Sequence, residues 1–286
     1  MIAAMITACA QGGQEKVIHD LPKAIDVKAF LSERELVRGV SREAWAALDL
    51  DGLNGPDGEI RALVTPHHAA AVALAAEAIG RLAENPPPAV IILGPNHYNT
   101  GEGATGTTSD FVYHGDRISV EAAALSRLAA KGLISLNDAP FEQEHSVGML
   151  LPVIRWYLPE AKVIPIIFHH GYEAQKIIDI IKELEPETDG GAVIIASIDF
   201  SHHLDRDRAA ERDIKMREYL ENGDAATIAG LDSSYVDSPT IMSALLLHFG
   251  TEGMEIIANT NSGVLMENPS SDCTSYFTIQ FCQAQI

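Results

Sequence analysis

The sequence has little cysteine. Three cysteines occur in 286 residues, and Cys9, Cys273 and Cys282 show no CxxC spacing. A disulfide framework needs a larger and regularly spaced set of cysteines. The sequence therefore excludes a small scaffold held together by disulfides.

Long apolar runs and positive charge are also scarce. No apolar run reaches the roughly 18 to 20 residues that cross a bilayer, so no transmembrane segment is expected. Forty acidic residues oppose twenty basic ones, which gives a net charge of −20. Because nucleic acid is bound through clustered Lys and Arg, this balance argues against a nucleic-acid partner.

Several catalytic motifs are missing. The sequence has no Walker loop, no GxSxG elbow and no HExxH pair, and no GxGxxG follows directly on an expected strand. These absences argue against nucleotide-binding, serine-hydrolase and zincin functions.

What is present is the pattern of a globular α/β protein. Apolar residues make up 47% of the chain and charged residues 21%. Apolar strand patterns alternate with helical patterns, which predicts a mostly parallel or mixed central sheet covered by helices on both faces. Strands are expected at 59–65, 89–93, 162–168, 192–198, 254–259 and 274–282, and helices at 69–84, 145–158, 172–185, 205–221, 223–231 and 239–249. Residues 117–131 are expected to form the end of a strand and then a helix. We expect a flexible segment over residues 1–20 and a single domain over residues 21–286.

Three of the expected strands have histidine at their exits. These are His67 and His68 after 59–65, His97 after 89–93, and His202 and His203 after 192–198. Gly94-Pro95 is expected to end the second strand. The carboxyl ends of parallel strands meet at one edge of a sheet, so the histidines are expected to form one site. Imidazole is suited to metal binding and to proton transfer near neutral pH. The alternative is that they are loop or capping histidines.

Four further residues are candidates for the same site. Asp199 either orients an imidazole or binds substrate, or it caps a helix. Glu144 and His145 are either a helix start that is favourable with the helix dipole or part of the site. Cys273, near the last strand, is a candidate ligand.

The first residues bear on location. Met5-Ile-Thr-Ala-Cys9 resembles the end of a bacterial lipoprotein signal, but the basic region and the full apolar region of such a signal are missing. A cytoplasmic location is therefore favoured. The alternative is an extracytoplasmic lipoprotein anchored at Cys9, if the N-terminus is truncated.

Together these residues resemble the Memo family, also called AmmeMemoRadiSam system protein B. The resemblance spans roughly residues 59 to 281. Its motifs are Thr-Pro-His67, Leu-Gly-Pro-Asn-His97, Glu144-His145-Ser146 with Leu151-Pro152 after it, Ser197-Ile-Asp199-Phe-Ser-His202, and a final Ser-Tyr-Phe strand. The family is similar in fold to the catalytic subunit of class III extradiol dioxygenases. The resemblance implies a metal pocket at the strand ends, and possible family partners are a radical SAM protein and an AMMECR-type protein.

The resemblance also implies roles for single residues. His67 and His97 match the two metal-binding histidines, and His202 matches the histidine that acts as general base in the dioxygenases. His145 and Asp199 match pocket positions. The third ligand of the family is a Glu or a Cys in a late loop that corresponds to residues 259–263, where neither type occurs. Nearby candidates are Glu267 and Cys273.

Two functions from different classes follow. The first is a metal-dependent enzyme, redox or hydrolytic, with iron, zinc or copper at His67 and His97 and with His202 as acid and base, acting on a small molecule. The second is a non-catalytic platform that keeps the fold and binds a ligand or partner. In either case the ring nitrogens of His67 and His97 should lie within about 4 to 5 Å of each other, because each would lie near 2.1 Å from one ion.

Overall fold

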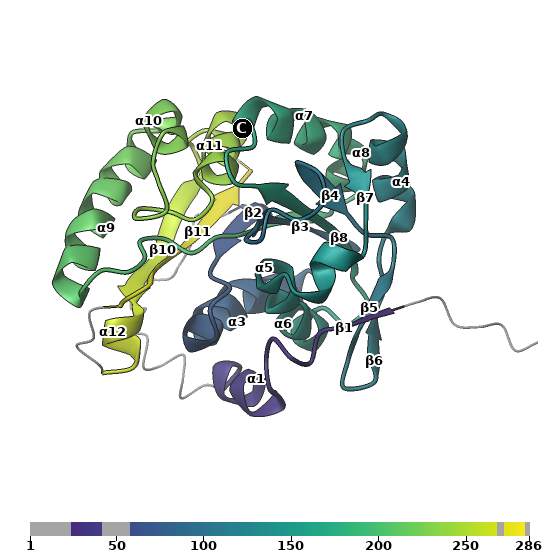
Figure 1. Ribbon diagram of the computed structural model, residues 1–286, viewed down its shortest axis with the longest axis horizontal. Helices are drawn as coiled ribbons and strands as arrows, with labels where there is room; N and C mark the ends of the chain where they lie inside the picture. Colours follow the sequence, from purple (N-terminus) through teal and green to yellow (C-terminus); the bar gives the residue numbers. More distant parts are fainter. Residues whose placement is uncertain (1–23, 42–57, 268–271, 284–286) are drawn as a thin grey trace, which may run out of the picture.

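The computed structural model describes residues 24–41, 58–267 and 272–283 (Figure 1). The expected flexible segment 1–20, with Cys9 in it, lies outside these residues. Among the described residues no helix is both long and apolar enough to cross a membrane.

A mixed sheet forms the centre of the described structure. Its strand order is β10-β11-β2-β9-β3-β8-β4-β7. The strands are β2 (Ile60–Thr65), β3 (Ala89–Asn96), β4 (Ala104–Gly106), β7 (Ser135–Leu136), β8 (Lys162–His169), β9 (Val193–Ser197), β10 (Met254–Asn261) and β11 (Ser275–Cys282). The four central strands β2, β9, β3 and β8 pair in parallel, whereas β11 is antiparallel to β2 and β4 is antiparallel to β8.

The central strands are parallel because both of their faces are buried. Every residue of β3 and β9 is buried, which matches the nearly continuous apolar runs that parallel strands need. Their carboxyl ends therefore lie along one edge, and the strands β2, β9 and β3 are direct neighbours there.

Helices cover both faces of the sheet, as the sequence predicts (Figure 1). The helices α3, α5 and α6 lie on one side of it, and α7, α10 and α11 lie on the other. The helices are α1 (Glu33–Gly39), α3 (Val72–Gly80), α4 (Ala122–Ala130), α5 (His145–Gly148), α6 (Leu150–Tyr157), α7 (Ala174–Glu183), α8 (Glu185–Asp189), α9 (Arg206–Glu221), α10 (Ala225–Ala229), α11 (Pro239–Phe249) and α12 (Ser262–Leu265). The helix expected over 69–84 is α3 with a short 3₁₀ turn at each end.

A second, three-stranded sheet was not foreseen. It consists of β1 (Ala24–Asp26), β5 (Asp110–Tyr113) and β6 (Asp116–Ile118), in the order β1-β5-β6. Strands of three or four residues are too short to show a clear alternation of apolar and polar residues, so the sequence pattern does not reveal them. The side chains of Ile25 and Phe111 belong to the same hydrophobic core as the large sheet.

The expectation that Gly94-Pro95 ends its strand is wrong. β3 continues through both residues to Asn96, paired with the end of β8. β9 pairs with β3 only up to Leu93, and the Pro95 carbonyl accepts a hydrogen bond from the Ser146 hydroxyl at 2.8 Å. Glycine is required at 94 because a Cβ there would lie 2.6 Å from the Ser146 oxygen. The Gly-Pro pair therefore lets the start of α5 approach the strand closely.

The segment after β3 contains β4 and three glycines. Gly101, Gly103 and Gly106 have GxGxxG spacing. A dinucleotide-binding fingerprint follows a strand and opens a helix. These glycines lead into β4 instead, so they do not form that fingerprint.

Asp213, in α9, has a buried carboxyl group. Ser275 and Asn259 both donate hydrogen bonds to its Oδ2. Burial nevertheless raises the pKa of Asp213 from 3.8 to about 6. The unfolded chain loses this proton near pH 4, and the folded chain loses it only near pH 6. The free energy of unfolding therefore falls between pH 4 and 6, and above pH 6 the loss of stability caused by the buried charge stays constant.

Asp213→Asn should therefore stabilise the protein in a pH-dependent way. The amide has no proton to lose in this range, and its oxygen can accept both hydrogen bonds. We expect a gain of about 2 to 3 kcal/mol at pH 7 and almost none at pH 4, measured by urea unfolding at several pH values. Asp207→Asn, on the exposed side of the same helix, is the control. A gain that does not change with pH would show that burial of the Asp213 charge is not its cause.

Candidate metal centre

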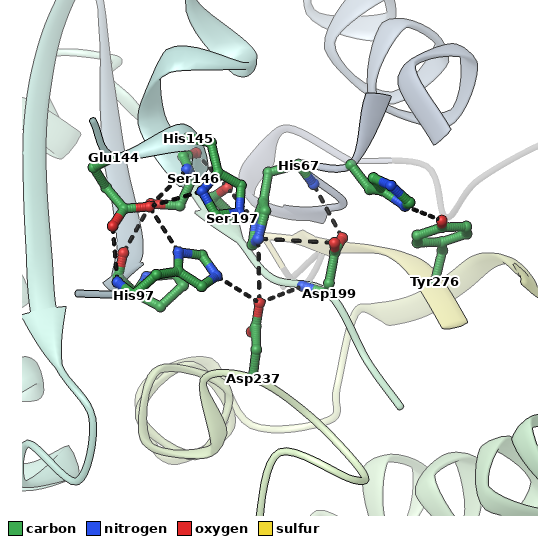
Figure 2. Close-up of polar contacts among 11 residues, drawn as sticks. His67, His97, Glu144, His145, Ser146, Ser197, Asp199, Asp237 and Tyr276 are labelled. Carbon is green, nitrogen blue, oxygen red and sulfur yellow. Dashed lines mark hydrogen bonds and ion pairs between the residues drawn. The ribbon is translucent and has the colours of Figure 1, made fainter. Parts of the chain in front are cut away.

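Three imidazoles meet at the carboxyl edge of the central strands (Figure 2). His67 follows β2, His97 follows β3 and His145 begins α5. One nitrogen from each ring lies within 4.8 Å of the other two. The rings of His97 and His145 are stacked, with centroids 4.0 Å apart, and the centroids of His67 and His97 are 5.1 Å apart. The distance expected between His67 and His97 is therefore found.

Glu144 fixes His97 from behind. Its side chain accepts hydrogen bonds from the His97 backbone N–H at 2.8 Å and from the His97 Nδ1–H at 2.7 Å. The same carboxylate accepts from the Ser146 N–H and so caps α5. Glu144 is thus both a helix cap and part of the site. The bond to Nδ1 leaves Nε2 as the free nitrogen of His97, a common arrangement around metal-binding histidines.

His67 is held on its Nδ1 side by one hydroxyl group. The Ser197 hydroxyl donates to the Ser146 carbonyl at 2.5 Å, so it accepts from His67 Nδ1–H at 3.0 Å. Nε2 of His67 is then the nitrogen that faces the other rings. Glu144 and Ser197 therefore aim the equivalent nitrogens of two imidazoles into one space.

Asp199 and Asp237 bring two carboxylates to this space. Asp237 Oδ2 lies 3.3 Å from Nε2 of His67 and 3.9 Å from Nε2 of His97, and Asp199 Oδ2 lies 3.8 Å from Nε2 of His67 (Figure 2). Asp199 also accepts a hydrogen bond from the His67 backbone N–H at 3.1 Å. The alternative that Asp199 caps a helix does not hold, because Asp205 caps α9.

Sequence analysis missed Asp237. It lies just before α11 rather than after a strand, so a search for polar residues at strand exits passes over it. The backbone N–H of Asp237 donates to the Asp199 carbonyl, and the Asp199 N–H donates to Asp237 Oδ2. The only available signal was an acidic residue beside the Ser238-Pro239 helix start.

The charges of the site shift two of the imidazoles in opposite directions. Burial opposes protonation of His67, but Asp199 and Asp237 outweigh it and raise the pKa of His67 to about 9. Burial, together with the nearby imidazoles of His97 and His67, lowers the pKa of His145 to about 4. Without a metal, therefore, the site holds a proton on His67 and keeps His145 neutral.

The residues fit a divalent metal ion. Imidazole and carboxylate are ligands of zinc and of non-haem iron. Asp237 Oδ1 is buried and has no hydrogen-bond partner among the described residues, which is unusual for a carboxylate oxygen unless a cation or a donor group satisfies it. His67, His97 and His145 could hold the ion, with Asp237 as the nearest carboxylate.

A polar cleft opens beside His97 and Asp237. Its volume is about 310 Å³, and its walls come from the ends of β3 and β8 and from residues 233–240. His169 and His170 line it as well. His169 is the last residue of β8 and His170 follows it. Both come directly after the strand expected at 162–168, so the same signal could have found them. A small molecule in this cleft would lie next to the imidazoles.

The remaining candidate histidines are not part of the group formed by the three imidazoles. His68 Nδ1 lies 2.5 Å from the hydroxyl of the buried Tyr276, and the exposed His203 pairs with Asp272 at 2.9 Å. The ring of His202 lies 6.1 Å from that of His203, and its Nδ1 is buried without a hydrogen-bond partner in the described part of the chain. The role of His202 as a base remains a prediction.

The expected third ligand is not found where the resemblance placed it. Asn259 and Asn261 belong to β10, where Asn259 donates to Asp213 and Asn261 caps α12. Cys273 is buried, and its backbone forms an isolated β-bridge with Leu204. His145 and Asp237 are the residues that stand beside His67 and His97.

Comparison with known proteins decides the family. The family model described as "Memo-like protein" matches residues 44–267. This chain belongs to the Memo-like family. The relatives include a MEMO1 family protein of Methanopyrus kandleri, 28% identical over 71% of this chain and 74% of its own length. Another, from Caldivirga maquilingensis, is 25% identical over 62% of this chain and 66% of its own length.

A solved structure has the same fold. The uncharacterized protein JW3007 from Escherichia coli K12 matches 78% of this chain and 99% of its own, with a TM-score of 0.53 and 14% identity. At this level of identity the similarity concerns the fold only. The partners that the resemblance implied, a radical SAM protein and an AMMECR-type protein, stay a prediction.

Metal binding at this Memo-like site should release a proton. His67 has a pKa of about 9 without metal, so near pH 7.5 a proton must leave Nε2 before it can bind an ion, and affinity should rise with pH up to about 9. Titration calorimetry with Zn²⁺ in two buffers of different ionisation enthalpy should show release of about one proton. Asp237→Asn should lower this number, because the variant lacks a carboxylate that raises the pKa of His67. Heat that is the same in both buffers would contradict the prediction.

Proposed function

We propose that the protein binds a divalent metal ion through His67, His97 and His145, with Asp237 beside them. One observation carries the proposal: nitrogens of the three imidazoles lie within 4.8 Å of one another. Two of these rings are held from behind by Glu144 and Ser197. Such support orients a ligand and raises its basicity.

We further propose that the metal serves an oxidoreductase of the extradiol dioxygenase type, acting on a small molecule in the adjacent cleft. The observation that favours an enzyme is the cleft itself, which reaches His97 and Asp237. When bound, the ion would supply a Lewis acid that binds substrate oxygens. His97 is held at the cleft by Glu144, and Asp237 can take a proton from a group bound there. The residue at the position of the family's general base is His202.

Metal content tests the first part. His67→Ala and His97→Ala should each lose stoichiometric metal after loading with Zn²⁺ or Fe²⁺, because each variant removes one of the three proposed imidazole ligands. His145→Ala and Asp237→Asn identify the further ligands: loss of metal marks a ligand, and retention marks a neighbour. Elemental analysis of the purified proteins is the measurement.

His114→Gln, on an exposed turn between β5 and β6, is the control and should keep its metal. Circular dichroism and urea unfolding show whether a variant is folded. If folded His67→Ala and His97→Ala both keep a full equivalent of metal at this site, metal binding through these residues is wrong.

Turnover tests the second part. His202→Ala should keep the metal and lose oxygen uptake with catechols, because ligand and base are separate roles. The measurement is O₂ consumption by the iron-loaded protein, with the exposed neighbour variant His203→Ala as the control. Loss of metal in His202→Ala would make His202 a ligand. If the metal-loaded parent turns over no catechol, other diol or simple ester, the non-catalytic platform is the correct function.

A further inference from the structure

A second cleft lies at the amino end of β2. Its volume is about 390 Å³, and its walls come from the start of β2, the end of β11 and the last residues of α8 and α11. Arg61 lines it from the second position of β2, whereas His67 follows the other end of that strand. No described residue lines both clefts, so the second cleft is separate from the candidate metal centre.

Arg61 brings a positive charge to the second cleft. Its side chain is half-buried, and the chain has forty acidic residues against twenty basic ones. Even so, Arg61 forms no ion pair with any described residue. A guanidinium group offers five N–H donors and binds a carboxylate through two parallel hydrogen bonds. Arg61 is therefore available for the acid group of a ligand.

Asp189 and Glu252 bring two negative charges to the same cleft. Both are exposed, and within the described part of the chain neither pairs with Arg61 or with another basic group. An ammonium group has three N–H donors, so it can bind two carboxylates at once. Burial lowers the pKa of His248, which also lines the cleft, so its ring adds no charge at neutral pH. Opposite charges thus share the cleft without neutralising each other.

The charges of the second cleft limit the class of its ligand. A plain anion would be repelled by Asp189 and Glu252, and a plain cation would be repelled by Arg61. A ligand that carries both charges can pair with all three side chains. Phe249 gives the cleft an apolar wall, and its ring is fixed against Phe281 with the centroids 5.4 Å apart. The ligand is therefore a small zwitterion with an apolar part.

We propose that the second cleft binds a free α-amino acid with an apolar side chain. Its carboxylate pairs with Arg61, its ammonium group pairs with Asp189 and Glu252, and its side chain lies against Phe249. One carbon atom joins the two charged groups of an α-amino acid, so both fit between the opposite charges of the cleft. The volume of about 390 Å³ is at the low end of ligand pockets, which suits a molecule of this size.

The test separates the two charges of the ligand. The probes are L-phenylalanine and L-leucine, their analogues without the ammonium group (phenylpropionate and isocaproate), and their analogues without the carboxylate (phenethylamine and isoamylamine). Each is titrated by calorimetry into the metal-free full chain, because amino acids bind metal ions themselves. The variants are Arg61→Gln and the double variant Asp189→Asn with Glu252→Gln. Arg208→Gln, on the exposed side of α9, is the matched control.

The parent and Arg208→Gln should bind at least one amino acid, and both of its analogues at least tenfold more weakly. Arg61→Gln and the double variant should each weaken binding about tenfold or more, because each loses charge-assisted hydrogen bonds. Their unfolding temperatures show that they are folded. The proposal is overturned if neither amino acid binds, if an analogue binds as tightly as its parent amino acid, or if folded Arg61→Gln binds unchanged.

Metal content keeps this proposal apart from the proposed metal function. Arg61→Gln should take up as much zinc as the parent, because Arg61 and His67 lie at opposite ends of β2. Binding of an amino acid by a protein that takes up no zinc would support this proposal and contradict the metal function. Loss of zinc from folded Arg61→Gln would show that the second cleft is not a separate site.

Discussion

The site depends on the parallel pairing of β2, β9, β3 and β8. Parallel strands need burial on both faces, and they place all their carboxyl ends along one edge. The direct neighbours β2, β9 and β3 therefore bring His67, Asp199 and His97 together from positions up to 132 residues apart. α5 and the segment before α11 fill the remaining sides of this edge with His145 and Asp237. A change in strand order or register would separate all of these groups at once.

Two buried groups of the site, Glu144 and Ser197, have fixed hydrogen-bond partners. Glu144 and Ser197 are fully buried, and each is satisfied by an imidazole and by a backbone group of the 144–146 segment. These hydrogen bonds occupy Nδ1 of His67 and of His97, so the Nε2 atoms of the two rings face Asp237 and each other. Without a metal, a proton on His67 compensates the carboxylates. A divalent ion would compensate the charge of these carboxylates more fully than the proton, because it carries twice the charge and can contact several ligands at once.

The sequence allowed the central fold and part of the site to be predicted, for physical reasons. Strong apolar runs define β3, β8 and β9, and a histidine directly after such a run has only one edge of the sheet to occupy. His67 and His97 could therefore be placed together. Gly94-Pro95 has the pattern of a strand end but does not end β3, because β3 pairs with a single neighbour at that point and proline can be accommodated there. Asp237 could not be found, since its position depends on a loop that is hydrogen-bonded to Asp199 and has no period or strand exit to reveal it.

That loop also joins the two halves of the cleft. Phe200 and Val236 form an isolated bridge, and the backbones of Asp199 and Asp237 are hydrogen-bonded to each other. The next residue, Ser238, begins α11. One short segment therefore sets both the carboxylate that faces the imidazoles and the helix start that faces the cleft.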